Sequence, residues 1–162
     1  MPFAMICGRG DDDLLVACDA PSIREEDAAL VGGQVLDETE SRTLAASAVA
    51  HFGSGMLATE AGRAALRAWA DVVATRVDAW YIAFDLDAID AAEGLAVAMP
   101  EPNGLSLDAA VQAIEADAAS GPVVAIGVTA AMFGGDGDAD ATVRAVARLI
   151  AAALGVASTD VR

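Results

Sequence analysis

Short runs of apolar residues alternate along this chain with longer segments in which apolar residues recur at every third or fourth position. Most of the short runs end at glycine or at an acidic residue, which is typical of buried strands. They predict strands at residues 28–33, 49–52, 79–85 and 122–130.

The longer segments have the spacing of amphipathic helices. They predict helices at residues 37–48, 59–77, 106–119 and 140–154. In the second of these, Leu66 and Val73 recur on one face, and Thr59 stands where the helix begins. Ser106 is expected to cap the third helix, and Gly155 to end the last one. The first 18 residues remain open between helix, strand and loop.

Strands separated by helices predict an α/β fold, a parallel sheet with helices on both faces. No linker or internal repeat interrupts the pattern, so residues 1–162 are expected to form a single domain. Ligands of such sheets bind where the strands end at their carboxyl side, and the strand at residues 79–85 ends there in acidic residues.

The composition narrows the possible partners. The formal net charge is −16, and the count of nine basic residues consists of arginine alone. Such a surface repels nucleic acid and anionic lipid, so we expect neither a nucleic-acid nor a membrane partner. The excess of acidic residues is itself explained by the solubility that a high net charge gives a protein.

The two cysteines, Cys7 and Cys18, match no zinc or redox spacing. We expect both to be small, reduced core residues of a cytoplasmic protein. The first residues lack the basic segment of a signal peptide, and Arg148 interrupts the last apolar run before it reaches membrane-spanning length.

In the segment "AWYIAFDLDAID" (79–90), a hydrophobic strand is followed by three acidic residues, Asp85, Asp87 and Asp90. On an extended backbone Asp85 and Asp87 point to the same side. Two ionised carboxylates in a partly buried place repel each other unless a cation offsets their charge, and Mg²⁺, Mn²⁺ or Ca²⁺ prefers such oxygen ligands. The alternative is that these acids cap the next loop or face water.

A second acidic cluster, "GGDGDADAT" (134–142), places Asp136, Asp138 and Asp140 at alternate positions, as at the start of an EF-hand loop. An EF-hand needs Gly at its sixth position and Glu at its twelfth, where this chain has Ala141 and Ala147. The cluster is therefore better interpreted as a solvated loop that caps the last helix.

The segment "FDLDAIDAAEGLAVAMPEPNGLS" (84–106) resembles the signature of the arginase–agmatinase (ureohydrolase) family. In that signature, a strand ends in an S-x-D-x-D-x-x-D-P pattern that is followed by G-T-P and then by G-G-L before a helix. The residues in register are Asp85, Asp87, Asp90, Pro100, Gly104 and Leu105. "DAALVGGQVLDETESRTLAASAVAHF" (27–52) resembles a second family segment, with Asp37 and Glu40 in register. The chain as a whole resembles the C-terminal half of a ureohydrolase, a partial arginase-like three-layer fold.

The resemblance implies a chemistry. In that family a pair of Mn²⁺ ions activates a hydroxide that attacks a guanidinium carbon and releases urea. Carried over, Asp85 and Asp87 would be metal ligands, and Asp37 would lie near a guanidino substrate. Asp90 and Glu40 would support the site.

The departures from the family pattern are as informative. The family's histidine-bearing motifs, G-G-D-H and D-A-H-x-D, do not occur in these 162 residues, and His51, the one histidine, matches a non-catalytic position. The position of the guanidinium-binding Glu holds Ala130. Two hypotheses follow: a ureohydrolase-like protein that is inactive as this isolated chain, or half of a split amidinohydrolase completed by another chain. Either predicts a partner, a second copy of the chain or a complementary N-terminal half, because a half-sheet leaves an unpaired edge and apolar surface.

Overall fold

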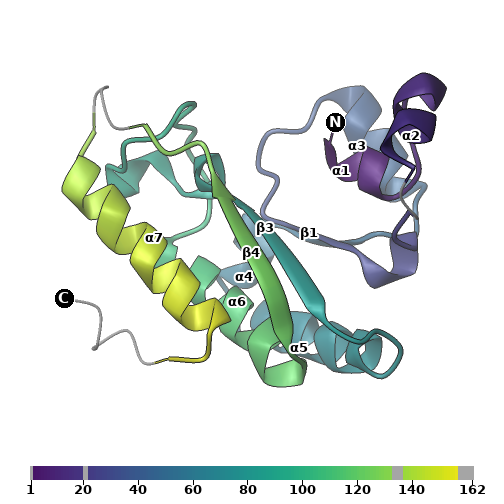
Figure 1. Ribbon diagram of the computed structural model, residues 1–162. Helices are drawn as coiled ribbons and strands as arrows, with labels where there is room; N and C mark the ends of the chain where they lie inside the picture. The colour runs from purple at the N-terminus through teal and green to yellow at the C-terminus, as the bar shows by residue number, and fades with distance from the viewer. Residues whose placement is uncertain (1, 20–21, 133–136, 157–162) are drawn as a thin grey trace. The chain divides into compact units, whose positions relative to one another are not determined.

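A computed structural model describes residues 2–19, 22–132 and 137–156. Helices and strands alternate through the described part of the chain (Figure 1). The helices are α1 (Pro2–Ile6), α2 (Asp12–Cys18), α3 (Glu38–Ala45), α4 (Ser54–Leu57), α5 (Glu60–Ala74), α6 (Leu107–Ser120) and α7 (Ala139–Ala153). The strands are β1 (Ala29–Val31), β2 (Ala50–Phe52), β3 (Trp80–Asp85) and β4 (Val123–Thr129). Each of the four predicted strands and four predicted helices is present: the strands, α3 and α5 are shorter than predicted, whereas α6 and α7 are shifted by one residue.

Side-chain caps fix the starts of the long helices. Thr59 accepts a hydrogen bond from the amide of Gly62, and Ser106 accepts one from the amide of Ala109, as predicted. The helix predicted over 59–77 ends earlier, at Ala74, where the Thr75 hydroxyl donates to the carbonyl of Val72. Hydroxyl side chains compete in this way with the backbone hydrogen bonds of a helix. The spacing of apolar residues therefore predicts a helix longer than the one observed.

Contacts between residues divide the described chain into two compact units. The first comprises described residues of 1–31 and 36–51, and the second those of 32–35 and 52–162. In the first unit, β1 pairs with β2 in a two-stranded sheet, with Ala50 N donating to Ala28 O at 3.0 Å. Ala28 is the one core hydrophobic among the described residues of this unit. The unit therefore has little interior of its own.

The helices at the N-terminal side of the first unit are open to solvent. α2 has no buried residue, and Leu14 and Val16 on it are 53% and 78% exposed. Cys7 is half-buried, whereas Cys18 is exposed. The expectation that both cysteines are core residues is therefore wrong for Cys18, because the short helix that carries it packs no face inward.

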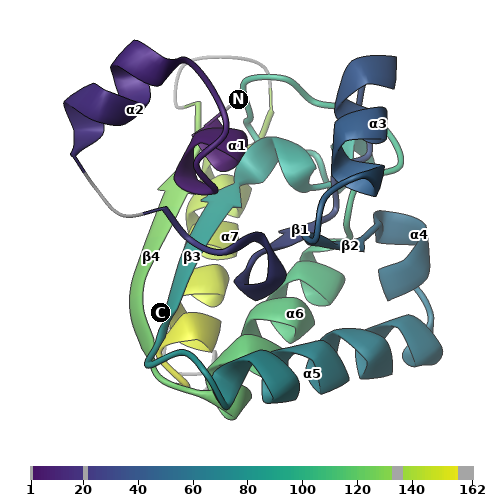
Figure 2. The same ribbon diagram turned by 90° about the vertical axis from the view of Figure 1, so that its right-hand side faces the viewer.

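The second unit is built on β3 and β4. These strands pair in parallel, from Tyr81 opposite Ala125 to Asp85 opposite Thr129. α6 packs against β3, α7 packs against β4 and α6, and α5 packs against α6. Figure 2 shows the two arrows pointing the same way with these helices beside them. The predicted fold class, α/β with parallel strands, is confirmed.

Small and branched side chains fill the core of this unit. On α5, Leu66, Ala70 and Val73 are fully buried on the predicted face. Trp69 packs its ring against those of Phe52 and Trp80, with centroids 5.9 and 5.8 Å apart. Gly62 allows α4 to pack close, since a Cβ there would lie 2.0 Å from the carbonyl oxygen of Met56.

The other face of the β3–β4 pair is bare. Tyr81 is 58% exposed, and Ala83 and Ala125 on the same face are exposed as well. Parallel strands occur almost always with both faces covered, and their sequences then read as continuous apolar runs, as both of these do. Both strands therefore have sequences typical of strands that are buried on two faces. In the described chain, only one face of the pair is covered.

Candidate functional site

The candidate site lies where β3 ends. Asp85 is the last residue of that strand and is exposed. The chain then turns directly into a 3-10 helix, Leu86–Ala88, whose first turn is closed by a 3.0 Å hydrogen bond from Asp87 N to Asp85 Oδ1. The prediction that both carboxylates follow strand alternation is therefore wrong for Asp87, because the strand has already ended there. Asp85 instead serves as the acceptor of a local turn.

Asp87 is half-buried and held at both its side chain and its backbone. Its Oδ1 accepts a hydrogen bond from Met99 N at 2.8 Å. Its carbonyl oxygen accepts one from the Gln34 side-chain amide at 3.0 Å. Gln34 thus contacts the backbone of the site.

Asp90 lies one turn further along the same loop. Its Oδ1 accepts a hydrogen bond from Ala92 N at 2.8 Å and so begins the 3-10 helix Ala91–Glu93. Its own amide donates to the carbonyl of Leu105 at 2.9 Å. These contacts are compatible with the supporting role that the resemblance implies.

Asp37 and Glu40 belong to the first unit and bond to each other's backbone. Asp37 Oδ1 accepts from Glu40 N at 2.7 Å, and Glu40 Oε2 accepts from Asp37 N at 3.1 Å, a capping box that starts α3. This reciprocal arrangement explains both acids without a ligand. Their substrate-binding and supporting roles stay predictions.

The donor set does not fit the manganese pair of the resemblance. Among the described residues, no group of three or more His, Cys, Asp or Glu side chains could hold a metal ion. Asp85 and Asp87 are the two carboxylates at the strand end, and Ala130, just after β4, brings none. A divalent ion there would take most of its ligands from water.

The second acidic cluster acts as the sequence predicts where the structure describes it. Asp138 caps α7 by accepting a hydrogen bond from Ala141 N at 2.8 Å. Asp136 lies outside the described residues.

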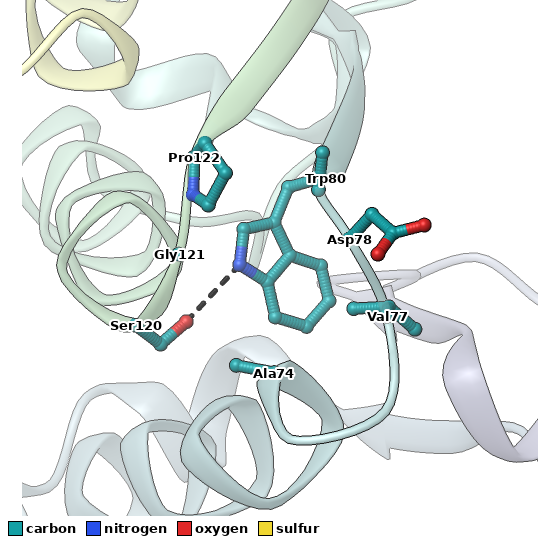
Figure 3. Close-up of a pocket in the computed structure, with 8 residues that line it drawn as sticks. Ala74, Val77, Asp78, Trp80, Ser120, Gly121 and Pro122 are labelled. Carbon is teal, nitrogen blue, oxygen red and sulfur yellow. Dashed lines mark hydrogen bonds between the residues drawn. The ribbon is translucent and has the colours of Figure 1, made fainter.

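A pocket of about 260 Å³ lies at the opposite end of β3 (Figure 3). The Trp80 indole forms part of its wall and donates to Ser120 Oγ at 3.1 Å, beside Asp78, Gly121 and Pro122. Asp85 is five residues along the strand from Trp80, about 16 Å at the usual strand rise. The pocket and the carboxylates are therefore separate features.

The sequence analysis missed one buried acid. Asp117 in α6 has a carboxyl oxygen, Oδ1, that is buried without a hydrogen-bond partner in the described part of the chain. Burial raises the pKa of Asp117 to about 7. The signal was present in the helix period, because Asp117 follows the buried residues Ala110 and Ile114 at helical spacing.

No helix in the described ranges is both long enough and apolar enough to cross a membrane. Carboxylates at the carboxyl end of parallel strands define an α/β protein with its candidate site at the sheet edge. The chain belongs to the arginase family, whose family model matches residues 1–155. No curated protein matches this chain.

Solved structures give the same picture of the fold. Arginase from Bacillus subtilis superposes with a TM-score of 0.83 at 21% identity, covering 97% of this chain and 58% of that one. Entamoeba histolytica arginase in complex with L-ornithine gives 0.81 at 20% identity, covering 96% and 52%. Formimidoylglutamase from Bacillus subtilis gives 0.68 at 20% identity, covering 81% and 41%. The predicted partial arginase-like α/β fold is confirmed, and the chain spans little more than half the length of the solved arginases.

Proposed function

We propose that this chain is an arginase-family protein that keeps the carboxylate part of a guanidino-hydrolase site and is inactive as an isolated chain. The observation that carries the proposal is the donor set at the end of β3: Asp85 and Asp87, each already bonded to a backbone amide, with no third donor grouped with them among the described residues. In this proposal, the release of urea from a guanidino substrate is the activity of the ancestral protein.

The metal affinity of such a pair is expected to be low. Borderline ions such as Mn²⁺ are held in proteins by imidazole together with carboxylate, and two carboxylates leave most coordination positions to water. We therefore expect binding no tighter than about millimolar, which leaves little metal bound under ordinary conditions.

The substrate class is a small linear amidine or guanidine. The solved relatives include arginases, one of them in complex with L-ornithine, and a formimidoylglutamase. Arginine and agmatine are thus the substrates to offer this chain. A cytoplasmic location also suits it, because Cys7 and Cys18 are free thiols and such thiols persist in a reducing compartment.

A urea assay tests the proposal. The purified chain is incubated with arginine or agmatine, with and without Mn²⁺, and urea is measured over hours. We expect no release above the enzyme-free control. Manganese-dependent release that disappears in Asp85→Asn, but persists in the exposed α5 variant Asp71→Asn, would overturn the proposal.

A second candidate function is half of a split amidinohydrolase. One observation favours it, the bare β3–β4 face around Tyr81. The occupant we propose for that face is a complementary α/β chain that carries the missing histidine motifs. Such a chain would cover the apolar face and bring imidazole donors to the two carboxylates.

The DNA immediately upstream of the coding sequence separates the two candidates. If it encodes the G-G-D-H and D-A-H-x-D motifs in another reading frame, the two products should co-purify and release urea together. Tyr81→Arg should then abolish both co-purification and activity. If no such frame exists, or if the two products do not associate, the first candidate stands: an arginase-family chain that is inactive in isolation.

A further inference from the structure

We infer that Asp85 and Asp87 act in this chain as acceptors for backbone amides that hold the β3–α6 loop (residues 86–106) closed, in place of metal ligation. The inference goes beyond the proposed function and does not depend on it, because a loop clamp is required of the fold whether or not the chain hydrolyses anything.

The β3–α6 loop is a packed part of the second unit. Leu86, Ile89 and Leu105 are between 0% and 2% exposed. Ile89 and Leu105 form a parallel bridge, and the amide of Leu105 donates to the carbonyl of Ala88 at 2.8 Å. A loop with this burial must hold a defined backbone path, because displacing its buried leucines would open cavities.

Close approach of the two ends of the loop depends on Gly104. A Cβ at this position would lie 2.6 Å from the amide nitrogen of Asp90 and 2.7 Å from the carbonyl oxygen of Ala88. The start and end of the loop thus touch through their backbones. Backbone contacts hold the loop on either side of Met99: the amide of Ala98 donates to the carbonyl of Ala130 at 3.1 Å, and the carbonyl of Glu101 accepts from the amide of Ala91 at 3.0 Å.

Asp87 adds a side-chain attachment between these two points. Its Oδ1 accepts from Met99 N at 2.8 Å, a bond that spans 12 residues of the loop. The Asp87 backbone is fixed in turn by Gln34, whose side-chain amide donates to the Asp87 carbonyl at 3.0 Å. Met99 itself is 65% exposed, so its side chain contributes little to the position of this segment. A charge-assisted bond to its amide is the stronger restraint.

Asp85 sets the orientation of Asp87. Asp87 N donates to Asp85 Oδ1 at 3.0 Å within the turn that follows β3. Two successive hydrogen bonds therefore connect the strand end to the far side of the loop. Asp85 accepts from the amide of Asp87, and Asp87 accepts from the amide of Met99. In each step the partial positive charge of an N–H group offsets the carboxylate charge, which is the role a cation would otherwise fill.

The experiment compares Asp87→Ala with Asp87→Asn. Asparagine keeps an acceptor oxygen for Met99 N, whereas alanine removes it. Asp71→Ala on α5 is the matched control for loss of one negative charge. Melting temperature and hydrogen exchange at the Met99 amide are measured, each with and without 1 mM Mn²⁺, a concentration of about the dissociation constant expected for such a site.

We expect the Asp87→Ala melting temperature to fall by about 3–8 °C, the effect of losing one charge-assisted hydrogen bond in a domain of this size. Met99 exchange should accelerate at least tenfold in Asp87→Ala. Asp87→Asn and Asp71→Ala should stay within about 2 °C of the parent, with Met99 still protected and with no response to Mn²⁺.

Three results would overturn the inference: a Met99 amide that is unprotected in the parent chain, unchanged Met99 exchange in Asp87→Ala, or a Mn²⁺-dependent rise in melting temperature that Asp87→Asn abolishes. If Asp87→Ala does not fold, the double variant Asp85→Asn with Asp87→Asn decides. It should fold and protect Met99, and loss of that protection would count against the clamp. Urea release is scored separately, so failure of the clamp and failure of the proposed function remain distinguishable.

Discussion

The buried carboxyl group of Asp117 in α6 contributes to the pH dependence of the stability of this protein. Desolvation raises its pKa from 3.8 to about 7, because no hydrogen bond within the described residues offsets the burial of Oδ1. The folded state therefore binds this proton more tightly than the unfolded chain does. The resulting stability is fully present below the unfolded pKa and is lost as the pH rises through about 7.

Asp117→Asn should remove this dependence. The amide resembles the protonated acid in shape and carries no charge, so the variant should match the parent near pH 4 and exceed it at pH 8 by on the order of 2–4 kcal/mol. Urea unfolding at pH 4, 6 and 8 measures the effect. Glu115→Gln, an exposed position on the same helix, is the control and should leave the pH profile unchanged. A parent whose stability does not fall between pH 5 and 8 would contradict the buried, unpaired carboxyl.

The sequence identified the acids of the candidate site by their position and left their bonding open. It placed Asp85 at a strand end, which is local information carried by the apolar run before it. It could not show that Asp87 bonds to Met99, because that contact depends on the path of the chain between two residues that are 12 apart in the sequence. The spacing of Asp117 after Ala110 and Ile114 could have predicted its burial, but the lack of a hydrogen-bond partner for its Oδ1 among the described residues depends on how α6 packs.

At the scale of elements, short-range signals predicted most of the fold. N-caps act within one turn, so Thr59 and Ser106 could be read directly. The short helices α1, α2 and α4 have too few residues for a period, and the sequence left the first two open and missed the third. The connection between α7 and the β3–α6 loop could not be predicted from the sequence either, because it joins two residues that are 46 apart in the chain.

That connection is the hydroxyl of Thr142, which is completely buried in α7. Its Oγ1 accepts from Ala96 N at 2.8 Å and donates to the carbonyl of Asp138 at 2.8 Å. Thr142→Val keeps the shape and removes the acceptor, leaving the Ala96 amide buried and unpaired. We expect a loss of roughly 1–3 kcal/mol in unfolding free energy.

Thr43→Val on the exposed side of α3 is the control for this change, since its hydroxyl bonds only within its own helix in the contacts described, to the carbonyl of Thr39. Chemical unfolding of both variants gives the comparison. Equal effects at the two positions would mean that the bond to Ala96 contributes nothing particular to stability.

At the scale of the molecule, the exposed apolar surface conflicts with the behaviour of an independent monomer. The bare β3–β4 face includes Tyr81, and the first unit exposes Leu14 and Val16 with little core beneath them. A chain with a net charge of −16 resists self-association through repulsion, and salt screens that repulsion. Association driven by apolar surface should therefore strengthen as salt is added.

We predict that the isolated chain is a dimer or larger at micromolar concentration in 150 mM salt. Tyr81→Arg should shift it toward monomer, because a charge on the bare face opposes burial of that face. Val72→Arg, at a position on α5 with the same 58% exposure, is the matched control and should not. Light scattering coupled to size exclusion reports the mass. A parent that elutes as a stable monomer at all salt concentrations would contradict this prediction.

We propose that the carboxylates at the end of β3 are an incomplete metal site, and calorimetric titration of Mn²⁺ measures this property itself. Mn²⁺ is titrated into the parent chain and into the double variant Asp85→Asn with Asp87→Asn. We expect binding no tighter than about millimolar in the parent, with no tighter class of sites lost in the variant. Micromolar binding in the parent that the double variant abolishes would contradict it.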